Sequence, residues 1–134
     1  MGLIVDTSVL VAAERSQFDL TSFLQQERHQ TVGISAVTVA ELLLGAERAV
    51  APNSRIRRAA FADWIIQHVP VIPFGVAEAR RHAELRGYLM RQGTTIGAHD
   101  LQVAATAIAG GHAVVTLDVA DFSRVPGLEV IDPR

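Results

Sequence analysis

Two short apolar runs, one near each end of the chain, restrict the folds that this sequence can adopt. Residues 3–8 read Leu-Ile-Val-Asp-Thr-Ser, and residues 113–118 read Ala-Val-Val-Thr-Leu-Asp. Apolar, largely β-branched runs of this length are typical of parallel strands buried on both faces. Ligands bind at the carboxyl edge of such sheets, so the acids that end these runs, Asp6 and Asp118, are candidates for chemistry. The alternative is that Asp6 or Ser8 only caps a helix that begins near residue 9.

The rest of the chain alternates further short strands with longer helices. Strands are predicted at residues 32–34, 71–72 and 128–131, and helices at residues 8–13, 20–28, 36–46, 55–67, 76–92 and 101–109. Strands joined by helices in this way form a parallel sheet with right-handed crossovers. We therefore predict one domain spanning residues 1–134, with a three-layer α/β/α fold around a central, mostly parallel sheet of four to five strands.

The composition excludes several classes of enzyme. The sequence contains no cysteine and no lysine, and its twelve basic residues are all arginine. Disulfides, thiolate metal sites, Cys nucleophiles, P-loops and Schiff bases are therefore excluded. The formal net charge of -2 gives no general attraction to nucleic acid, so such binding needs a local basic patch. No apolar stretch approaches a membrane span and the first residues do not resemble a secretory signal, so we expect a cytoplasmic protein without membrane association.

Two further acids fall on predicted helices. Glu41 is a single carboxylate within the otherwise apolar helix 36–46, and Asp100 opens an Ala-rich helix. In the alternative interpretation, Glu41 lies on a solvated stripe with Thr38 and Arg48, and the helix dipole alone accounts for Asp100. The apolar surface of helix 36–46 is too extensive for one core contact, which predicts packing against a second subunit in a homodimer.

Taken together, the four acids predict a metal site. If the first and fourth strands are central neighbours, Asp6 and Asp118 lie side by side at the edge of the sheet. The two helices can then direct Glu41 and Asp100 into the same notch. Four ionised carboxylates in one pocket require a cation, and oxygen ligands without Cys or a histidine pair favour Mg²⁺ or Mn²⁺. Such ions promote attack of water on phosphate esters, so the chemistry suggested is phosphodiester hydrolysis.

Hydroxyl groups and one histidine border these acids. Thr7, Ser8 and Thr116 have no evident paired base, so we predict that they orient carboxylates or water molecules rather than act as nucleophiles. His99 precedes Asp100, but adjacent helical residues point about 100° apart, which disfavours a joint role as general base and ligand.

A basic cluster occupies the predicted helix 76–92. Its members are Arg80, Arg81, Arg86 and Arg91. The alternative to nucleic-acid binding is that these arginines pair with Glu78 and Glu84 on a solvated helix face.

The ordered motifs resemble those of PIN-domain ribonucleases of the bacterial VapC toxin type. The matching segments are residues 5–8 (Val-Asp-Thr-Ser), 38–42 (Thr-Val-Ala-Glu-Leu), 99–105 (His-Asp-Leu-Gln-Val-Ala-Ala) and 115–118 (Val-Thr-Leu-Asp), followed by Asp121 and Phe122. The resemblance covers essentially the whole chain, and four motifs in order are far more specific than any one of them. It implies that the predicted α/β/α domain is PIN-like.

This resemblance also implies an activity. Proteins of this type are Mg²⁺-dependent endoribonucleases that cleave tRNA, rRNA or mRNA, form homodimers and are silenced by a cognate antitoxin on another chain. By analogy Asp6 and Asp100 are metal ligands, and Glu41 and Asp118 complete the site. Asp121 is either a supporting acid or part of the terminal helical turn. The implied RNA contacts are Arg80, Arg81 and Arg86.

Two other classes of function remain as alternatives. A haloacid-dehalogenase-type phosphatase also places an acid after its first strand, but it requires a second Asp where this chain has Ser8, and a lysine that this chain lacks. A non-catalytic homodimeric module would instead use the acidic notch to bind a basic peptide.

Overall fold

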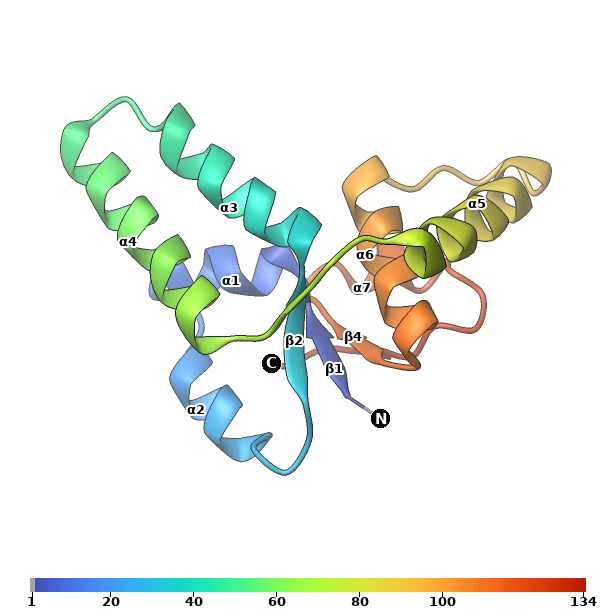
Figure 1. Cartoon of the computed structure of the whole chain (residues 1–134), viewed down its shortest axis with the longest axis horizontal. Coiled ribbons are helices and arrows are strands. Elements are labelled where there is room, and N and C mark those ends of the chain that lie inside the picture. The colour runs from blue at the N-terminus through green and yellow to red at the C-terminus, as the bar shows by residue number, and fades with distance from the viewer. Residues whose placement is uncertain (1) are drawn as a thin grey trace.

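The computed structural model describes residues 2–134 as helices that surround a short-stranded sheet (Figure 1). The strands are β1 (Leu3–Val5), β2 (Val32–Ser35), β3 (Val71–Ile72), β4 (Ala113–Val115) and β5 (Val130–Ile131). The helices are α1 (Thr7–Glu14), α2 (Leu20–Gln26), α3 (Ala36–Arg48), α4 (Pro52–His68), α5 (Val76–Arg91), α6 (Ala98–Gly110) and α7 (Val119–Phe122). No helix within this described part of the chain is long and apolar enough to cross a membrane.

The sheet is parallel throughout and has the order β3-β2-β1-β4-β5. The chain first builds outward from β1 through β2 to β3 and then returns to add β4 on the other side of β1. The order therefore reverses between β1 and β4, which is where ligands bind in open parallel sheets. Val5 pairs with Val115 in this central ladder, so the residues that follow the two strands emerge side by side. The predicted fold class is confirmed.

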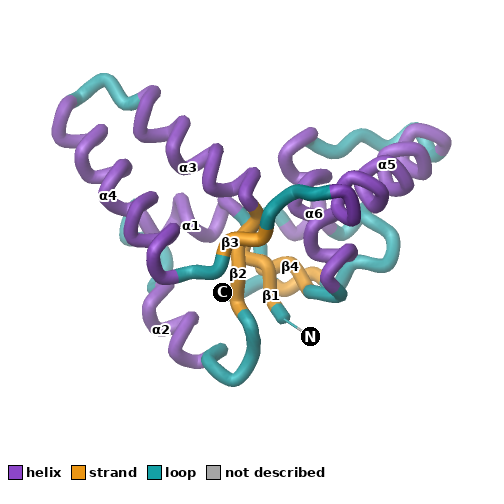
Figure 2. Tube along the Cα trace, in the orientation of Figure 1, coloured by secondary structure: helices purple, strands orange, loops and turns teal. Residues whose placement is uncertain are grey.

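Two layers of helices cover the sheet, as the strands between the two groups of helices in Figure 2 show. On β1, Ile4 belongs to the core beneath α5, α6 and α7, whereas Leu3 and Val5 belong to the core beneath α1, α2 and α4. Side chains alternate between the two faces of a strand, and both faces of β1 are apolar because both are covered. In Figure 1, α3 and α4 form one helical pair and α5 and α6 form the other.

Several predicted element boundaries differ from the observed ones by a few residues, including those of α2, α4, α6 and β5. Helix α4 begins at Pro52 rather than at residue 55, since proline is well suited to the first helical position. Strand β4 ends at Val115, so Asp118 lies in the turn before α7 rather than at the end of the strand itself. The turn gives Asp118 a position above the sheet edge.

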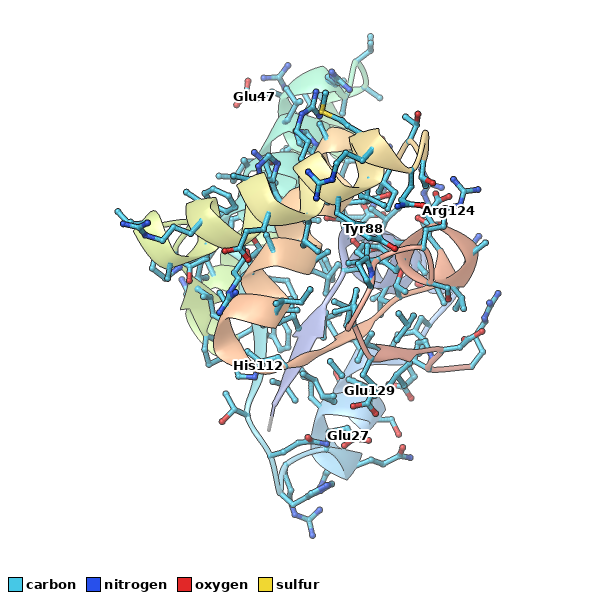
Figure 3. All side chains as sticks on the ribbon, turned by 90° about the vertical axis from the view of Figure 1, so that its right-hand side faces the viewer. Glu27, Glu47, Tyr88, His112, Arg124 and Glu129 are labelled. Atoms are coloured by element: carbon cyan, nitrogen blue, oxygen red, sulfur yellow. The ribbon has the colours of Figure 1, made fainter. Side chains whose placement is uncertain are left out.

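Side-chain contacts fix both ends of α6. At its C-terminal end, His112 Nδ1 accepts a hydrogen bond from the Gly2 backbone amide at 3.1 Å, and Figure 3 shows His112 at the lower end of this helix. Near its N-terminal end, Arg124, labelled at the upper right of Figure 3, donates to the Thr95 carbonyl at 3.1 Å. Because Thr95 shortly precedes α6, this bond helps to position the first turn of the helix.

Candidate active site

The four predicted acids line one open cavity of about 420 Å³ at the carboxyl edge of the sheet. Asp6 follows β1, Glu41 lies on α3, Asp100 lies in the first turn of α6, and Asp118 precedes α7. Four separate segments of the chain therefore contribute one carboxylate each. The geometry on which the sequence hypothesis depends is present.

Asp6 is the most constrained of these acids. Its side chain is buried, with 2% of the residue exposed. Oδ2 accepts hydrogen bonds from Ser8 Oγ at 2.7 Å and from Thr116 Oγ1 at 2.9 Å. It also accepts a longer bond of 3.4 Å from the Ser8 backbone amide, so Asp6 caps α1 as well as facing the cavity.

The second oxygen of Asp6 is left for the cavity. Within residues 2–134, Oδ1 accepts no hydrogen bond. Every fully buried side-chain oxygen in that range has a partner, so Oδ1 is not fully buried. Oδ1 must therefore reach the solvent of the cavity. An anchored carboxylate with one outward oxygen is the arrangement expected of a metal ligand, because the bonds to the other oxygen hold its orientation.

Ser8 and Thr116 join the ends of the two central strands. Besides binding Asp6, Ser8 Oγ accepts a hydrogen bond from the Leu117 amide at 3.1 Å, and Thr116 Oγ1 accepts one from the Asp118 amide at 2.9 Å. Both hydroxyls thus donate to the Asp6 carboxylate. Ser8 Oγ accepts from the segment after β4, and Thr116 Oγ1 accepts from its own turn. These bonds hold Asp6 and the Asp118 turn in a fixed relation.

We expect Thr116→Val to destabilise the protein by about 1–3 kcal/mol, because it removes a bond to the buried Asp6 and the acceptor of the Asp118 amide. Thr116 is fully buried, so water cannot replace the hydroxyl. Urea unfolding of this variant and of Thr31→Val, an exposed threonine, measures the difference. Equal free energies of unfolding for the two variants would show that the network does not contribute to stability.

Glu41 is held by groups on two other helices. Thr7 Oγ1, at the start of α1, donates to Glu41 Oε1 at 2.8 Å and lies 3.2 Å from the buried Thr38 hydroxyl. His99 Nδ1, in the first turn of α6, lies 3.1 Å from Glu41 Oε2. The role of Thr7 in orienting a carboxylate agrees with the sequence prediction, but the contact between His99 and Glu41 was not predicted.

Asp100 and Asp118 have pKa values above the ordinary range. Burial raises the pKa of Asp100 to about 6, and the charges of Asp6, Asp118, Asp121 and Glu41 add to the effect in that order. Burial, followed by the charges of Asp6 and Asp121, also raises the pKa of the Asp118 carboxyl. These shifts are those of carboxylates crowded into one cavity.

Neither Asp100 nor Asp118 makes a capping hydrogen bond, although Asp100 does lie in the first turn of α6, as the dipole alternative requires. Helix α6 begins at Ala98, and its N-terminal cap residue, Gly97, has no side chain that could make a capping bond. Asp118 occupies the N-terminal cap position of α7, but its side chain makes no capping bond. Both side chains instead line the acidic cavity.

The donor set fits a hard divalent cation. Carboxylate oxygens are the ligands that Mg²⁺ and Mn²⁺ prefer, and a cation would relieve the repulsion that adds to the effect of burial on the pKa of Asp100. Within residues 2–134, however, no three acidic or histidine side chains converge closely enough to form a ready-made ion site. Occupancy by an ion therefore requires side-chain rotations within the cavity.

The remaining predicted site residues lie outside this cavity lining. Asp121 is half-exposed in α7, 3.9 Å from the guanidinium of Arg124, and acts on the site through its charge. The three candidate RNA contacts are exposed on α5, and none of them lines the acidic cavity. They are Arg80, Arg81 and Arg86. Arg81 forms an ion pair of 3.0 Å with Glu84, which agrees with the structural alternative for this residue.

Comparisons with known proteins identify the family. The sequence matches the PIN domain over residues 3–128. It is 40% identical over 131 residues to Ribonuclease VapC1 of Rickettsia felis, with 98% of this chain and 96% of that protein covered. It is 33% identical over 99 residues to the tRNA(fMet)-specific endonuclease VapC of Salmonella typhimurium, covering 74% of this chain and 73% of that protein.

Solved structures agree with this assignment. The crystal structure of DNA-bound VapBC from Salmonella typhimurium contains a chain that matches this one with a TM-score of 0.89 and 25% sequence identity, and 98% of each chain is covered. The chain belongs to the PIN-domain family and, within it, to the VapC ribonucleases.

Proposed function

We propose that this protein is an endoribonuclease that hydrolyses phosphodiester bonds in cellular RNA with Mg²⁺, for which Mn²⁺ can substitute. The observation that carries the proposal is the convergence of Asp6, Glu41, Asp100 and Asp118 on one cavity, where one oxygen of the anchored Asp6 faces the solvent. The names of the relatives, which are ribonucleases and a tRNA endonuclease, support RNA as the substrate.

In such a site, some residues of this chain would bind the ion and others would hold those ligands in place. Asp6 and Asp100 would hold the ion, with Glu41 and Asp118 completing the set of oxygen ligands. A bound divalent ion supplies charge neutralisation and activates water for attack on phosphorus. Ser8 and Thr116 keep Asp6 in one orientation through the bonds to its Oδ2. The Glu41 carboxylate is steadied on one side by Thr7 and on the other by His99.

The test is cleavage of total cellular RNA by the purified protein with and without Mg²⁺. We expect cleavage with Mg²⁺, none with EDTA, and a loss of more than roughly a hundredfold in Asp100→Asn, because a direct ligand should matter more than the groups that support it. Asp63→Asn, an exposed acid on α4, is the matched control and should cleave like the wild type. Intact RNA in every reaction would overturn the proposal.

The alternatives give different results in the same experiment. A phosphatase would release inorganic phosphate from a small phosphate ester and leave RNA chains uncut. A non-catalytic module would bind a basic peptide through the acidic cavity without turnover of either substrate. Cleavage that is equal in wild type and Asp100→Asn would point to a contaminating nuclease.

We also propose a cognate antitoxin as the partner of this chain. Several of the solved relatives are complexes named VapBC, and one is described as a member of the VapBC family of toxin-antitoxin systems. An acidic cavity is electrostatically complementary to a basic segment on such a partner. The protein would then be the toxin of the pair.

A homodimer is the assembly that we propose for the free protein. Leu43 and Leu44 on α3 are 40% and 43% exposed, and Ile56 on α4 is 68% exposed. Exposed apolar side chains on neighbouring helices form a surface that association can bury. This surface is consistent with the interface expected from the apolar character of the α3 sequence.

A further inference from the structure

A turn with an unusual backbone conformation stands at the rim of the acidic cavity. Helix α1 ends at Glu14, and the Ser16 amide then donates to the Ala13 carbonyl at 3.0 Å. The Gln17 amide donates to the Ala12 carbonyl at 2.7 Å. These two bonds define a Schellman motif, in which the residue at the position of Ser16 adopts a left-handed conformation.

Ser16 departs from the usual residue choice at this position. Its φ is 59°, and it is the one non-glycine residue with positive φ among residues 2–134. Glycine is the usual residue there because a side chain in this conformation costs about 1 kcal/mol or more. The neighbours on either side of Ser16, which are Arg15 and Gln17, both line the acidic cavity. The left-handed residue therefore joins the two cavity-lining side chains.

Arg15 differs from the other arginines near α1 in having no ion-pair partner. Arg57 Nε donates to Glu14 Oε1 at 3.3 Å, and Arg58 Nε lies 3.9 Å from the same oxygen. Two arginines of α4 therefore share the Glu14 carboxylate. Arg58 also donates to the Gly45 carbonyl at 3.1 Å. Within residues 2–134, Arg15 makes neither an ion pair nor a side-chain hydrogen bond, and it is exposed.

The charge at this rim has a direct bearing on RNA binding. Arg15 is the one basic residue among the eleven that line the acidic cavity, where four are acids. An RNA backbone approaching the carboxylates meets repulsion, and the net charge of the chain, -2, does not offset it. A guanidinium can offset it locally, because it binds phosphate through two parallel hydrogen bonds.

We propose that the turn formed by residues 15–17 binds the RNA strand at the mouth of the acidic cavity. The Arg15 guanidinium binds a phosphate next to the bond that is cleaved. The side-chain amide of Gln17 binds the same segment of the RNA backbone. The left-handed Ser16 directs both side chains to one rim. This inference rests on the proposed ribonuclease function. It assigns to that function a phosphate-binding residue that is not on α5 and is not one of the four acids.

The test is RNA binding by Arg15→Gln in an Asp100→Asn background, in which cleavage does not obscure binding. The probe is a fluorescein-labelled, mixed-sequence single-stranded RNA, measured by anisotropy in Mg²⁺ over a series of KCl concentrations. We expect affinity to fall roughly tenfold, as for loss of a charge-assisted hydrogen bond. The slope of log affinity against log salt should become shallower by about 0.7, which is the value for one lost contact to a single strand.

Two matched variants separate a local contact from a change in total charge. Arg28→Gln removes the same charge from an exposed residue that follows α2. Its neighbour Glu27 is labelled near the bottom of Figure 3, at the end of the molecule where His112 also lies. Arg28→Gln should leave the salt slope unchanged. Arg15→Lys keeps the charge and should retain the slope with a loss of only a fewfold in affinity.

The same variants in the Asp100-containing protein provide the kinetic measurement. Arg15→Gln should raise KM for the RNA and leave kcat within a fewfold of the wild type, with an unchanged melting temperature because no intramolecular contact is lost. If Arg15→Gln and Arg28→Gln have the same affinity and salt slope while the wild type still cleaves RNA, the inference on Arg15 is overturned and the proposed function stands. If the wild type does not cleave RNA with Mg²⁺, the proposed function itself fails.

Discussion

Replacing Asp6 with Asn is expected to abolish RNA cleavage, with a loss of more than roughly a hundredfold, while the fold is retained. Asn keeps an oxygen that can accept the bonds from Ser8 and Thr116, and it is a favoured helix cap like Asp. It lacks the negative charge that a divalent ion requires. Cleavage of labelled RNA under single-turnover conditions, together with urea unfolding, measures the two effects separately.

Asp6→Ala is the matched partner of that variant. It should lose cleavage to the same extent and, in addition, destabilise the protein by about 1–3 kcal/mol, because both hydroxyls and the first turn of α1 lose an acceptor. If Asp6→Asn cleaved RNA at the wild-type rate, the carboxylate charge would not be required and the proposed site would be wrong. If Asp6→Ala were as stable as Asp6→Asn, the structural half of the prediction would fail.

Mg²⁺ should raise the melting temperature of the protein by about 10 °C at a concentration near one hundred times its Kd. Binding to the folded state alone at that concentration contributes about 2.7 kcal/mol, which corresponds to a shift of this size in a domain of this length. Asp100→Asn should show a much smaller shift because it removes a ligand. Differential scanning fluorimetry of both proteins and of Asp63→Asn checks this expectation. An identical shift in all three would place the ion elsewhere.

Without a metal ion, the protein should become less stable as the pH rises and Asp100 ionises. The pKa of Asp100 is raised from 3.8 to about 6 in the folded protein, so between these values the folded state binds more protons than the unfolded state. Stability due to this group is therefore present below pH 4 and is lost as the pH rises through 6. Solvent in the open cavity reduces the size of this effect. Asp100→Asn should remove part of the decline, and an unchanged pH profile would contradict the assignment.

The arrangement of the sheet and its acids followed from local patterns in the sequence. The two apolar runs that end at Asp6 and Asp118 identified buried parallel strands, and a reversal of strand order between them places both acids at one edge. Glu41 was noticeable as the single carboxylate of an otherwise apolar helix, with a solvated stripe as the alternative. For Asp6 and Asp118, the buried strand residues before them determined that the chain leaves the sheet at this edge.

Contacts between helices could not be predicted in the same way. The angle between adjacent side chains on a helix disfavoured a joint role of His99 and Asp100 as general base and ligand. Helix α3 packs beside α6, however, so the His99 ring, although largely exposed, reaches Glu41. Arg15 was missed for a related reason, because nothing in the sequence near residue 15 shows that α1 ends beside the acidic cavity.

The hydrogen bond between Thr116 and Asp6 joins residues that are 110 positions apart. During synthesis the ribosome makes the N-terminal half first, and that half already contains two of the four acids. The acidic cavity cannot form until β4 has been translated and has paired with β1, so under the proposed function a chain that lacks β4 would be inactive. The acidic cavity is therefore a property of the folded sheet and not of any single segment of the chain.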